Sequence, residues 1–387
     1  MWRRATAVLT ATATIVTTGV LPIATTGVLP IATIGVLPSA ARAAGPNEPF
    51  LGDLDGDRLP DWVMLRKLPR ACAVEVRYAR PGGGFLPPRQ YVYRVPGSPG
   101  TLACPELGAA VDLDPPAPPS QPGPAELVLG WYDGPPRRAG YDLLVLRNLA
   151  VAARVPAIDR PNHLGLTDFD GDRRLDVYLW TDQGEGFASY LNLGTGRLAA
   201  GPVRYCADRV QYRLADFDRD GATDLAVAYA NRCGDRADGV AVVLDDGSVV
   251  DLQVGFDSRT SWTIHVLNAD SNAFPDIVAY QQPSGRRWTF LGIGNGTFVR
   301  SPAARPDVVT VGLTGSVRIP VLANDWASRR AVVSIGTPPT EGSATVADGR
   351  TIVYRPNPTA GSIDRFDYRI TQDGRISEAS VLVRITP

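Results

Sequence analysis

DFDGDRRLD, at residues 168–176, carries oxygen side chains at its first, third, fifth and ninth positions. DLDGDRLPD at 53–61 and DFDRDGATD at 216–224 repeat these carboxylates in the same register, and NADSNAFPD at 268–276 is a weaker copy. Each copy runs straight into an apolar segment, which is VYLW, WVML, LAVAY and IVAY in the order named. The chain therefore repeats a unit in which an acidic loop leads into a β-strand.

The spacing of these side chains suits a hard cation. Ca²⁺ takes about six to eight oxygen ligands at roughly 2.3–2.6 Å, and alternate residues of a curled loop can point inward together. Without a cation, close carboxylates repel one another. We therefore expect Ca²⁺ in the loops, bound by side chains at positions 1, 3, 5 and 9 and by the carbonyl of position 7. The predicted ligands are Asp53, Asp55, Asp57, Leu59, Asp61, Asp168, Asp170, Asp172, Arg174, Asp176, Asp216, Asp218, Asp220, Ala222, Asp224, Asn268, Asp270, Asn272, Phe274 and Asp276.

An alternative is that these segments are Asx turns, which close a loop without metal. Three full copies in one register favour the metal. The first five positions resemble an EF-hand loop, but that loop places its Glu at position 12 and continues into a helix. Here apolar residues follow position 9 directly. The sequence predicts a calcium loop inside a β-hairpin.

Residues 1–43 have the features of an export signal. Arg3 and Arg4 form a positive start, an apolar segment follows, and residues 41–43 form an A-x-A cleavage site. The Arg pair also suggests the twin-arginine route, but its flanking residues fit ordinary secretion better. No later apolar run approaches the roughly 20 residues of a membrane-spanning helix. We therefore expect a secreted protein with no membrane span once the signal is removed.

Charge and cysteine content are typical of an exported protein. The formal net charge of −1 gives no support to nucleic-acid binding. Cys72, Cys104, Cys206 and Cys233 are the four cysteines, and they form no C-x-x-C motif or Cys/His cluster. Three pairings are possible. We favour Cys72–Cys104 and Cys206–Cys233, because each pair lies within one repeat unit.

The units recur through residues 44–303. Their loops begin at Asp53, Asp168, Asp216 and Asn268, and a degenerate copy begins at Asp112. Each unit reads as strand, acidic loop, strand, turn, strand, Gly-rich turn and short strand. Four short antiparallel strands repeated without a helix suit a β-propeller. We expect about five blades.

Residues 46–303 resemble the FG-GAP or VCBS repeats of integrin α-subunit propellers and secreted bacterial proteins. The resemblance rests on the D-x-D-x-D-x-x-x-D loops and on the G-x-G-x-F turn, seen as GNGTF at 294–298. It implies a propeller with Ca²⁺ in its hairpin loops. The family has Gly at position 6, which only Gly221 supplies, while Arg58 and Arg173 stand there in the other full loops.

The two remaining loops depart further. The Asn268 loop has only Asp270 and Asp276 as carboxylates, which predicts weaker binding. In the Asp112 loop a proline-rich insertion at 115–124 precedes Glu126. We expect this insertion to pull Glu126 out of register and to leave the loop without metal.

Strand alternation indicates where a ligand could bind. The acidic loops share one edge of the sheets, so the next connections lie at the opposite edge. Those connections begin near Trp131, Trp180, Tyr229 and Tyr280, beside Arg, Asp and Gln residues. Such mixtures are typical of sugar- or protein-binding surfaces. The alternative is that the four rings pack between blades.

The composition changes after Val299. Residues 301–307 read as a linker, and residues 304–387 contain short alternating strands that predict a two-sheet sandwich. VLAND at 321–325 and DRFDYRITQD at 364–373 resemble the cadherin-like or Ig-like modules of bacterial surface proteins. WASRR follows Asp325 in place of an acidic stretch, so calcium is not expected there. The resemblance implies a spacer or adhesive unit.

These observations predict an all-β, secreted, calcium-binding protein with a non-catalytic binding or adhesion role. Its ligand would be a carbohydrate or a protein surface, and we expect a monomer. No Ser/His/Asp grouping is evident, and His163 and His265 lie in contexts typical of packing or surface residues. The alternatives are a secreted polysaccharide-acting enzyme and a structural envelope component.

Overall fold

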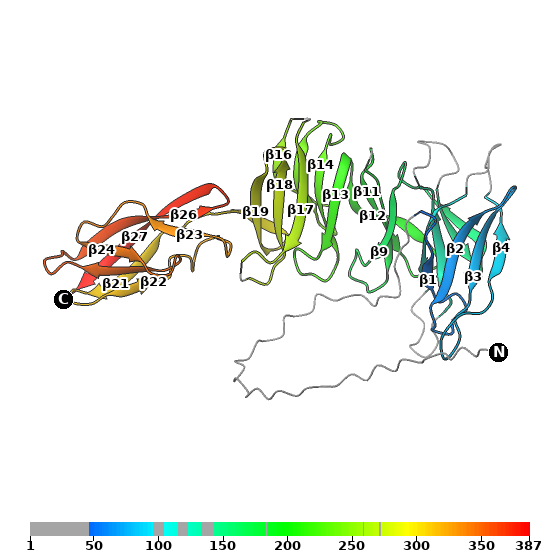
Figure 1. Ribbon diagram of the computed structural model, residues 1–387, viewed down its shortest axis with the longest axis horizontal. Helices are drawn as coiled ribbons and strands as arrows, with labels where there is room; N and C mark the ends of the chain where they lie inside the picture. The colour runs from blue at the N-terminus through cyan, green and yellow to red at the C-terminus, as the bar shows by residue number, and fades with distance from the viewer. Residues whose placement is uncertain are drawn as a thin grey trace, which may run out of the picture. The chain divides into compact units, whose positions relative to one another are not determined.

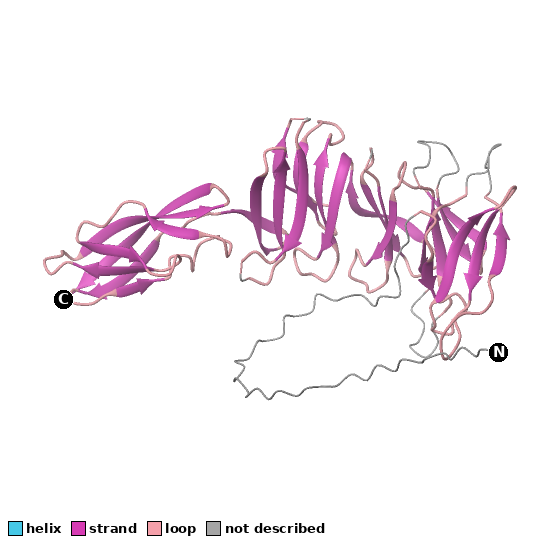
Figure 2. Ribbon diagram, viewed as in Figure 1, coloured by secondary structure: helices cyan, strands magenta, loops and turns pink. Residues whose placement is uncertain are grey.

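The computed structural model describes residues 46–95, 104–114, 123–132, 142–182, 184–257, 259–270 and 272–387. The expected export signal at 1–43 lies outside these residues. Within them the secondary structure is all β, which confirms the predicted class (Figures 1 and 2). The described part of the chain offers no helix with the length and apolarity needed to cross a membrane.

Twenty consecutive strands form five antiparallel sheets of four strands each in the described part of the chain. In every sheet the strands pair in chain order, so each sheet is a meander. The strands are β1 (Phe50–Gly52), β2 (Asp61–Lys67), β3 (Cys72–Arg77) and β4 (Arg89–Tyr93); β5 (Leu107–Val111), β6 (Glu126–Gly130), β7 (Leu143–Arg147) and β8 (Ala150–Val155); β9 (His163–Thr167), β10 (Asp176–Trp180), β11 (Phe187–Asn192) and β12 (Leu198–Tyr205); β13 (Asp208–Ala215), β14 (Asp224–Ala230), β15 (Asp238–Val243) and β16 (Val249–Gly255); β17 (Ser261–Leu267), β18 (Asp276–Gln282), β19 (Arg286–Gly294) and β20 (Thr297–Ser301).

The second and third strands of the second to fourth sheets are covered on both faces, which explains why their sequences are continuous hydrophobic runs. β6 and β14 are buried along their whole length, since alternate residues point to opposite faces. In β6, Leu127 and Leu129 belong to the core shared with β1–β4, whereas Val128 belongs to the core shared with β9–β12. Two further cores join the third sheet to the fourth and the fourth to the fifth.

Closure of the five sheets into a propeller remains a prediction. No strand pairing joins β17–β20 to β1–β4 within the described ranges. On β2 the side chains of Trp62, Met64 and Arg66 are half-buried, whereas Val63 and Leu65 are buried. One face of the first sheet is therefore covered less completely than the faces of β6.

The C-terminal strands form two sheets around a separate core. One sheet has the order β21 (Asp307–Gly312), β27 (Arg375–Thr386), β26 (Ile363–Gln372) and β23 (Val332–Ile335), with β21 parallel to β27. The other has the order β22 (Val317–Ile319), β25 (Ile352–Pro356) and β24 (Gly342–Val346). Tyr354, Phe366 and Tyr368 are buried in the core. The expected sandwich is confirmed.

Both predicted disulfides are confirmed. Cys72 in β3 bonds to Cys104 just before β5, and Cys206 bonds to Cys233 across the fourth repeat. The described residues contain no free cysteine.

Candidate metal-binding loops

The acidic loops connect the first and second strands of their sheets. The ninth residue of each predicted loop is the first residue of the second strand, as Asp176 is of β10. A backbone hydrogen bond joins the loops that begin at Asp168 and Asp216. The Thr223 amide donates to the carbonyl of Asp168 at 2.9 Å. The loops of the third and fourth sheets therefore lie at the same edge.

The ninth carboxylate has a structural role that the sequence did not reveal. Asp176 is fully buried; its Oδ2 accepts the Phe169 amide at 2.7 Å and its Oδ1 accepts the Asn192 amide at 2.7 Å. Through these bonds Asp176 closes its own loop at Phe169 and joins the loop to the end of β11 at Asn192. The same pair of bonds recurs at Asp61 with Leu54 and Ala79, at Asp224 with Phe217 and Asp245, and at Asp276 with Ala269 and Gly292.

Burial makes these carboxylates reluctant to ionise in the absence of a cation. Desolvation is the largest cause, and it raises the pKa of Asp176 and of Asp224 to about 7 and that of Asp276 to about 6. The backbone N–H donors act in the opposite direction and lower the pKa. A bound cation would stabilise the ionised form.

In chelator, the protein should become less stable as the pH rises from about 4 to about 7. Because the folded pKa of Asp176 is raised to about 7, protonation contributes stability that is fully present below the unfolded value of about 3.9 and is lost as pH passes through the folded pKa. A calcium ion that binds there would have to displace this proton, so we expect calcium affinity to fall on acidification. Thermal midpoints at pH 5.5 and pH 8 in chelator test the first statement; a higher midpoint at pH 8 would contradict it.

The carboxylates earlier in each loop make Asx turns. Asp168 accepts the Gly171 amide at 2.8 Å and the Arg173 amide at 2.7 Å, while Asp172 accepts the Arg174 amide at 2.8 Å. Positions 4 and 6 of this loop have positive φ. Such turns do not exclude a metal, because each carboxylate oxygen has a second lone pair.

In every full loop the residues at positions 4 and 6 have positive φ, which is the left-handed backbone region. Gly56 and Gly171 take position 4 with Arg58 and Arg173 at position 6. The 216–224 loop reverses this order, with Arg219 (φ 68°) at position 4 and Gly221 (φ 100°) at position 6. One arginine in each loop therefore adopts a strained conformation, which costs about 1–2 kcal/mol.

The side chains that converge are some of the predicted ligands together with Asp245, which was not predicted. Oxygens within 4.8 Å of one another belong to the groups Asp53, Asp55 and Asp57; Asp168, Asp170 and Asp176; Asp216, Asp218 and Asp224; and Asp218, Asp220 and Asp245. Ligands at roughly 2.3–2.6 Å from one ion lie at most about 5 Å apart, so these groups fit Ca²⁺. Asp172 is not in its loop's group and forms an ion pair with Arg174.

Asp245 is a candidate ligand that sequence reasoning missed. It follows β15, donates its amide to Asp224 at 2.8 Å and places its carboxylate beside Asp218 and Asp220. Burial, together with the charges of Asp220 and Asp218, raises its pKa. Its position in the Gly-rich turn DDGSV was the signal in the sequence; Asn192, at the end of β11, makes the corresponding amide bond to Asp176.

The expectation that the proline-rich insertion displaces Glu126 is wrong. Glu126 pairs with Val111 at the start of β6, as Asp176 pairs with Thr167 at the start of β10. Its Oε2 accepts the Leu113 amide at 2.9 Å. Glu126 therefore takes the place of the ninth carboxylate, because β5 and β6 pair in the same register as β9 and β10.

The Arg147 guanidinium balances the negative charge of the loop that begins at Asp112. Asp112, Asp114 and Glu126 converge like the other groups. The Nη2 of Arg147 lies 2.5 Å from Asp114 Oδ1, and its Nε lies 3.0 Å from Glu126 Oε1. The absence of metal from this loop stays a prediction, for which Arg147 supplies a new reason.

Arg147→Gln should destabilise the protein in chelator by about 1–2 kcal/mol, since it leaves the nearly buried Glu126 carboxylate without its cation. Added calcium should recover part of the loss by entering the vacated position. Thermal unfolding of the variant and parent measures both effects. An unchanged midpoint in chelator would contradict the balancing role of Arg147.

The Asn268 loop has no converging acidic group within the described residues. Asn268 Nδ2 donates to the Asn272 carbonyl at 2.5 Å, and Asn268 Oδ1 accepts a bond from Arg329 at 3.2 Å. The Arg329 bond occupies the Oδ1 atom through which Asn268 would bind a metal. Its geometry agrees with the expectation of weaker binding, which stays a prediction.

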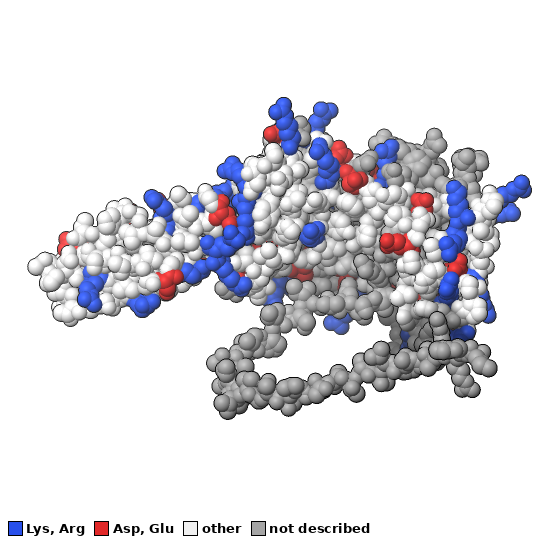
Figure 3. Space-filling model, in the orientation of Figure 1, with Lys and Arg blue, Asp and Glu red and all other residues white. Residues whose placement is uncertain are grey.

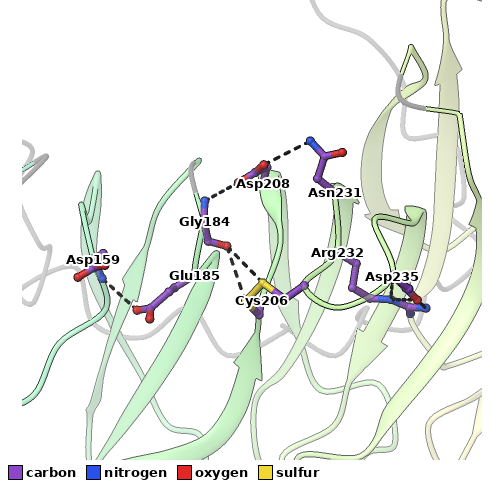
Figure 4. The surroundings of a disulfide bond; sticks show 9 residues. Asp159, Gly184, Glu185, Cys206, Asp208, Asn231, Arg232 and Asp235 are labelled. Atoms are coloured by element: carbon purple, nitrogen blue, oxygen red, sulfur yellow. Dashed lines mark hydrogen bonds and ion pairs between the residues drawn. A yellow bond between two sulfur atoms is a disulfide. The ribbon is translucent and has the colours of Figure 1, made fainter. Parts of the chain in front are cut away.

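The opposite edge of the third and fourth sheets is cross-linked. The Cys206–Cys233 disulfide lies there (Figure 4). Nearby, Asp208 accepts the Gly184 amide at 2.6 Å and the Asn231 side-chain amide at 3.3 Å. These contacts join loops of two consecutive sheets.

Arg232 adds two ion pairs at this edge. Its guanidinium lies 2.5 Å from Asp235 and 2.9 Å from Asp251. The bond to Arg232 lowers the pKa of Asp235. The loop after β14 is therefore fixed by a disulfide and by ion pairs.

The four aromatic residues proposed for ligand binding differ in exposure. Trp131 is 3% exposed and Tyr229 is 1% exposed, so packing explains both. Trp180 is half-buried and, with Tyr212, lines an open hollow of about 450 Å³; Tyr280 is half-buried against His265. Ligand binding by the four stays a prediction, and among them Trp180 has the most suitable surroundings.

Comparisons with known proteins agree with the sequence resemblance. A model of FG-GAP-like repeats matches residues 168–227, and a model of bacterial Ig domains matches residues 299–386. No curated protein matches this chain.

Similar solved structures share little sequence with the chain. BBS1N in complex with ARL6DN, soaked with lead, is 12% identical, with 82% of this chain and 94% of that chain covered and a TM-score of 0.34. The mercury-soaked counterpart is 11% identical, with 84% and 95% covered and a TM-score of 0.30. An endo-fucoidan hydrolase of glycoside hydrolase family 107 is 10% identical, with 90% and 44% covered and a TM-score of 0.18. The family matches are more specific: the chain contains an FG-GAP-like repeat at residues 168–227 and a bacterial Ig domain at residues 299–386.

Proposed function

We propose that the protein is a secreted, calcium-binding adhesion protein without catalytic activity. The observation that carries this proposal is the convergence of carboxylates in the loops that begin at Asp53, Asp168 and Asp216. The FG-GAP-like repeat and the bacterial Ig domain are of kinds suited to extracellular binding.

Calcium would rigidify the hairpins rather than contact the ligand. Each site lies between the first two strands of a sheet, and the connection to the third strand lies at the far end of the second strand. The proposal includes a propeller arrangement of the sheets, because radial repetition protects their edges.

The ligand surface is proposed at the edge opposite the acidic loops. It centres on the hollow that begins at Trp180, at that edge, and extends along β13 past Gln211, Tyr212, Arg213 and Leu214. Trp180 is held in place because its Nε1 donates to the Val210 carbonyl at 2.7 Å. An aromatic ring beside amide and guanidinium groups suits a carbohydrate or a protein surface.

The test is binding of the protein to immobilised polysaccharides and cell-surface proteins in calcium buffer. Saturable binding without product release, weakened at least tenfold in Trp180→Ala, would support the proposal. Trp62→Ala is the matched control, because it removes a half-buried tryptophan from another sheet. Release of sugars would instead indicate an enzyme, and binding unaffected by Trp180→Ala would contradict the proposed surface.

A further inference from the structure

Three arginine side chains converge on Trp288. The guanidinium carbon of Arg300 lies 3.4 Å from the centre of the indole ring, that of Arg375 lies 5.2 Å away and that of Arg286 lies 5.6 Å away. In Figure 3, basic side chains gather in the region where Figure 1 labels β19 and β26. The cluster is separate from the acidic loops.

Strand geometry explains why these residues meet. Arg286 and Trp288 are two residues apart on β19 and so share a face of the sheet. Arg300 on β20 pairs with Phe290, which places it on the same face. Arg375 begins β27, opposite Gln372 at the turn of the β26–β27 hairpin. Trp288 itself is 9% exposed and packs in the core between the fourth and fifth sheets.

No carboxylate forms an ion pair with this cluster among the described residues. No ion pair involves Arg286, Arg300 or Arg375 there. The Nε atoms of Arg300 and Arg375 are buried without an acceptor, as is Trp288 Nε1.

The carboxylate of Asp373, two residues before Arg375, already contacts other side chains. Asp373 lies 3.5 Å from Arg287 and 3.6 Å from Arg330, and it accepts a hydrogen bond from Thr289 at 3.0 Å. Burial, followed by the charges of Arg375 and Arg286, lowers the pKa of Arg300 to about 10. The three guanidinium groups are thus close enough to repel one another.

We propose that Arg286, Arg300 and Arg375 bind a compact oxyanion, either sulfate or phosphate, free or as an ester on a larger molecule. Interaction with a neutral indole gives each cation only about 0.5–2 kcal/mol, which does not explain three mutually repelling cations around one ring. An oxyanion would accept hydrogen bonds from the guanidinium groups and offset their repulsion. Trp288 would hold the groups in position.

The experiment is a titration of the full protein with sodium sulfate and, separately, sodium phosphate in chelator. Sodium chloride keeps the ionic strength constant, and tryptophan fluorescence and calorimetry report binding. We expect saturable binding of one ion per chain, with Arg286→Gln and Arg375→Gln each weakening it at least tenfold. Arg286 is exposed, so its variant should keep the fold.

Two control variants distinguish a specific anion site from nonspecific electrostatic attraction. Arg384→Gln removes an exposed arginine from the same strand as Arg375 and should change the dissociation constant less than twofold. Arg300→Lys keeps the charge but loses the planar fork and should also weaken binding. The proposal would be overturned if sulfate and phosphate gave no response beyond that of chloride. It would also be overturned if Arg384→Gln weakened binding as much as the cluster variants do, or if Arg286→Gln and Arg375→Gln kept the parent's affinity.

A second arm identifies the source of the anion. Dextran sulfate and unsulfated dextran are compared with inorganic sulfate. Tighter binding of dextran sulfate per sulfate group, lost in Arg286→Gln, would support an ester on a glycan. Binding of inorganic sulfate that is at least as tight would support a free ion.

Discussion

In chelator, Asp176→Ala should lower the free energy of unfolding by about 2–5 kcal/mol, and in calcium the loss should be larger by the contribution of one site, about 2.7 kcal/mol at a hundredfold excess over Kd. The substitution leaves the buried amides of Phe169 and Asn192 without their acceptor, and each unsatisfied donor costs about 1–3 kcal/mol. Urea unfolding at pH 7.5 measures the loss. A loss below about 1 kcal/mol in chelator would show that the ninth carboxylate serves only a metal.

Asp176→Asn is the matched control for this prediction. Its side chain has nearly the same shape and keeps one acceptor oxygen, so it should recover part of the stability in chelator. It should not recover calcium binding at this loop, because the carboxylate charge is gone. The two variants therefore separate the structural role of Asp176 from its role as a ligand.

Asp170→Ala should lose stability mainly in calcium and little in chelator. Asp170 is exposed and accepts one amide bond, from Asp172 at 3.2 Å, so the variant should lose little stability in chelator. In calcium it should lose the contribution of one site, which is about 2.7 kcal/mol at a hundredfold excess over Kd. Calorimetry should show one calcium ion fewer per chain, and Asp218→Ala should behave in the same way in the fourth sheet.

Asp246→Ala is the control for charge alone. Asp246 is exposed in the turn after β15 and belongs to no converging group. Its removal should leave the calcium stoichiometry unchanged. If Asp170→Ala and Asp218→Ala also kept the parent's calcium-dependent shift, the ligand assignments would be wrong.

The strand plan could be predicted because each unit repeats the same local signals. An acidic loop, an apolar run and a Gly-rich turn recur, and these signals placed the strands on either side of Asp168–Asp176 as the structure has them. Closure could not be deduced, because it depends on contacts between the ends of the array. The half-buried face of β2, with Trp62 and Met64, illustrates this limit.

The convergence of loop carboxylates could be predicted from the sequence, whereas their hydrogen bonds could not. Alternation along the loop brings Asp168 and Asp170 together, as expected. The sequence did not reveal the two amide bonds to Asp176, because one of them comes from Asn192, at the end of another strand. The contact of Arg147 with Glu126 was hidden for the same reason.

The most direct test of calcium binding is thermal unfolding of the protein in excess Ca²⁺ and then in chelator. Binding at the loops that begin at Asp53, Asp168 and Asp216 should raise the midpoint in calcium, with about 2.7 kcal/mol from each occupied site at a hundredfold excess over Kd. Mg²⁺ at the same concentration should give a smaller shift, since it demands a tighter octahedral site. Equal midpoints in calcium and in chelator would mean that the acidic loops are Asx turns that bind no metal.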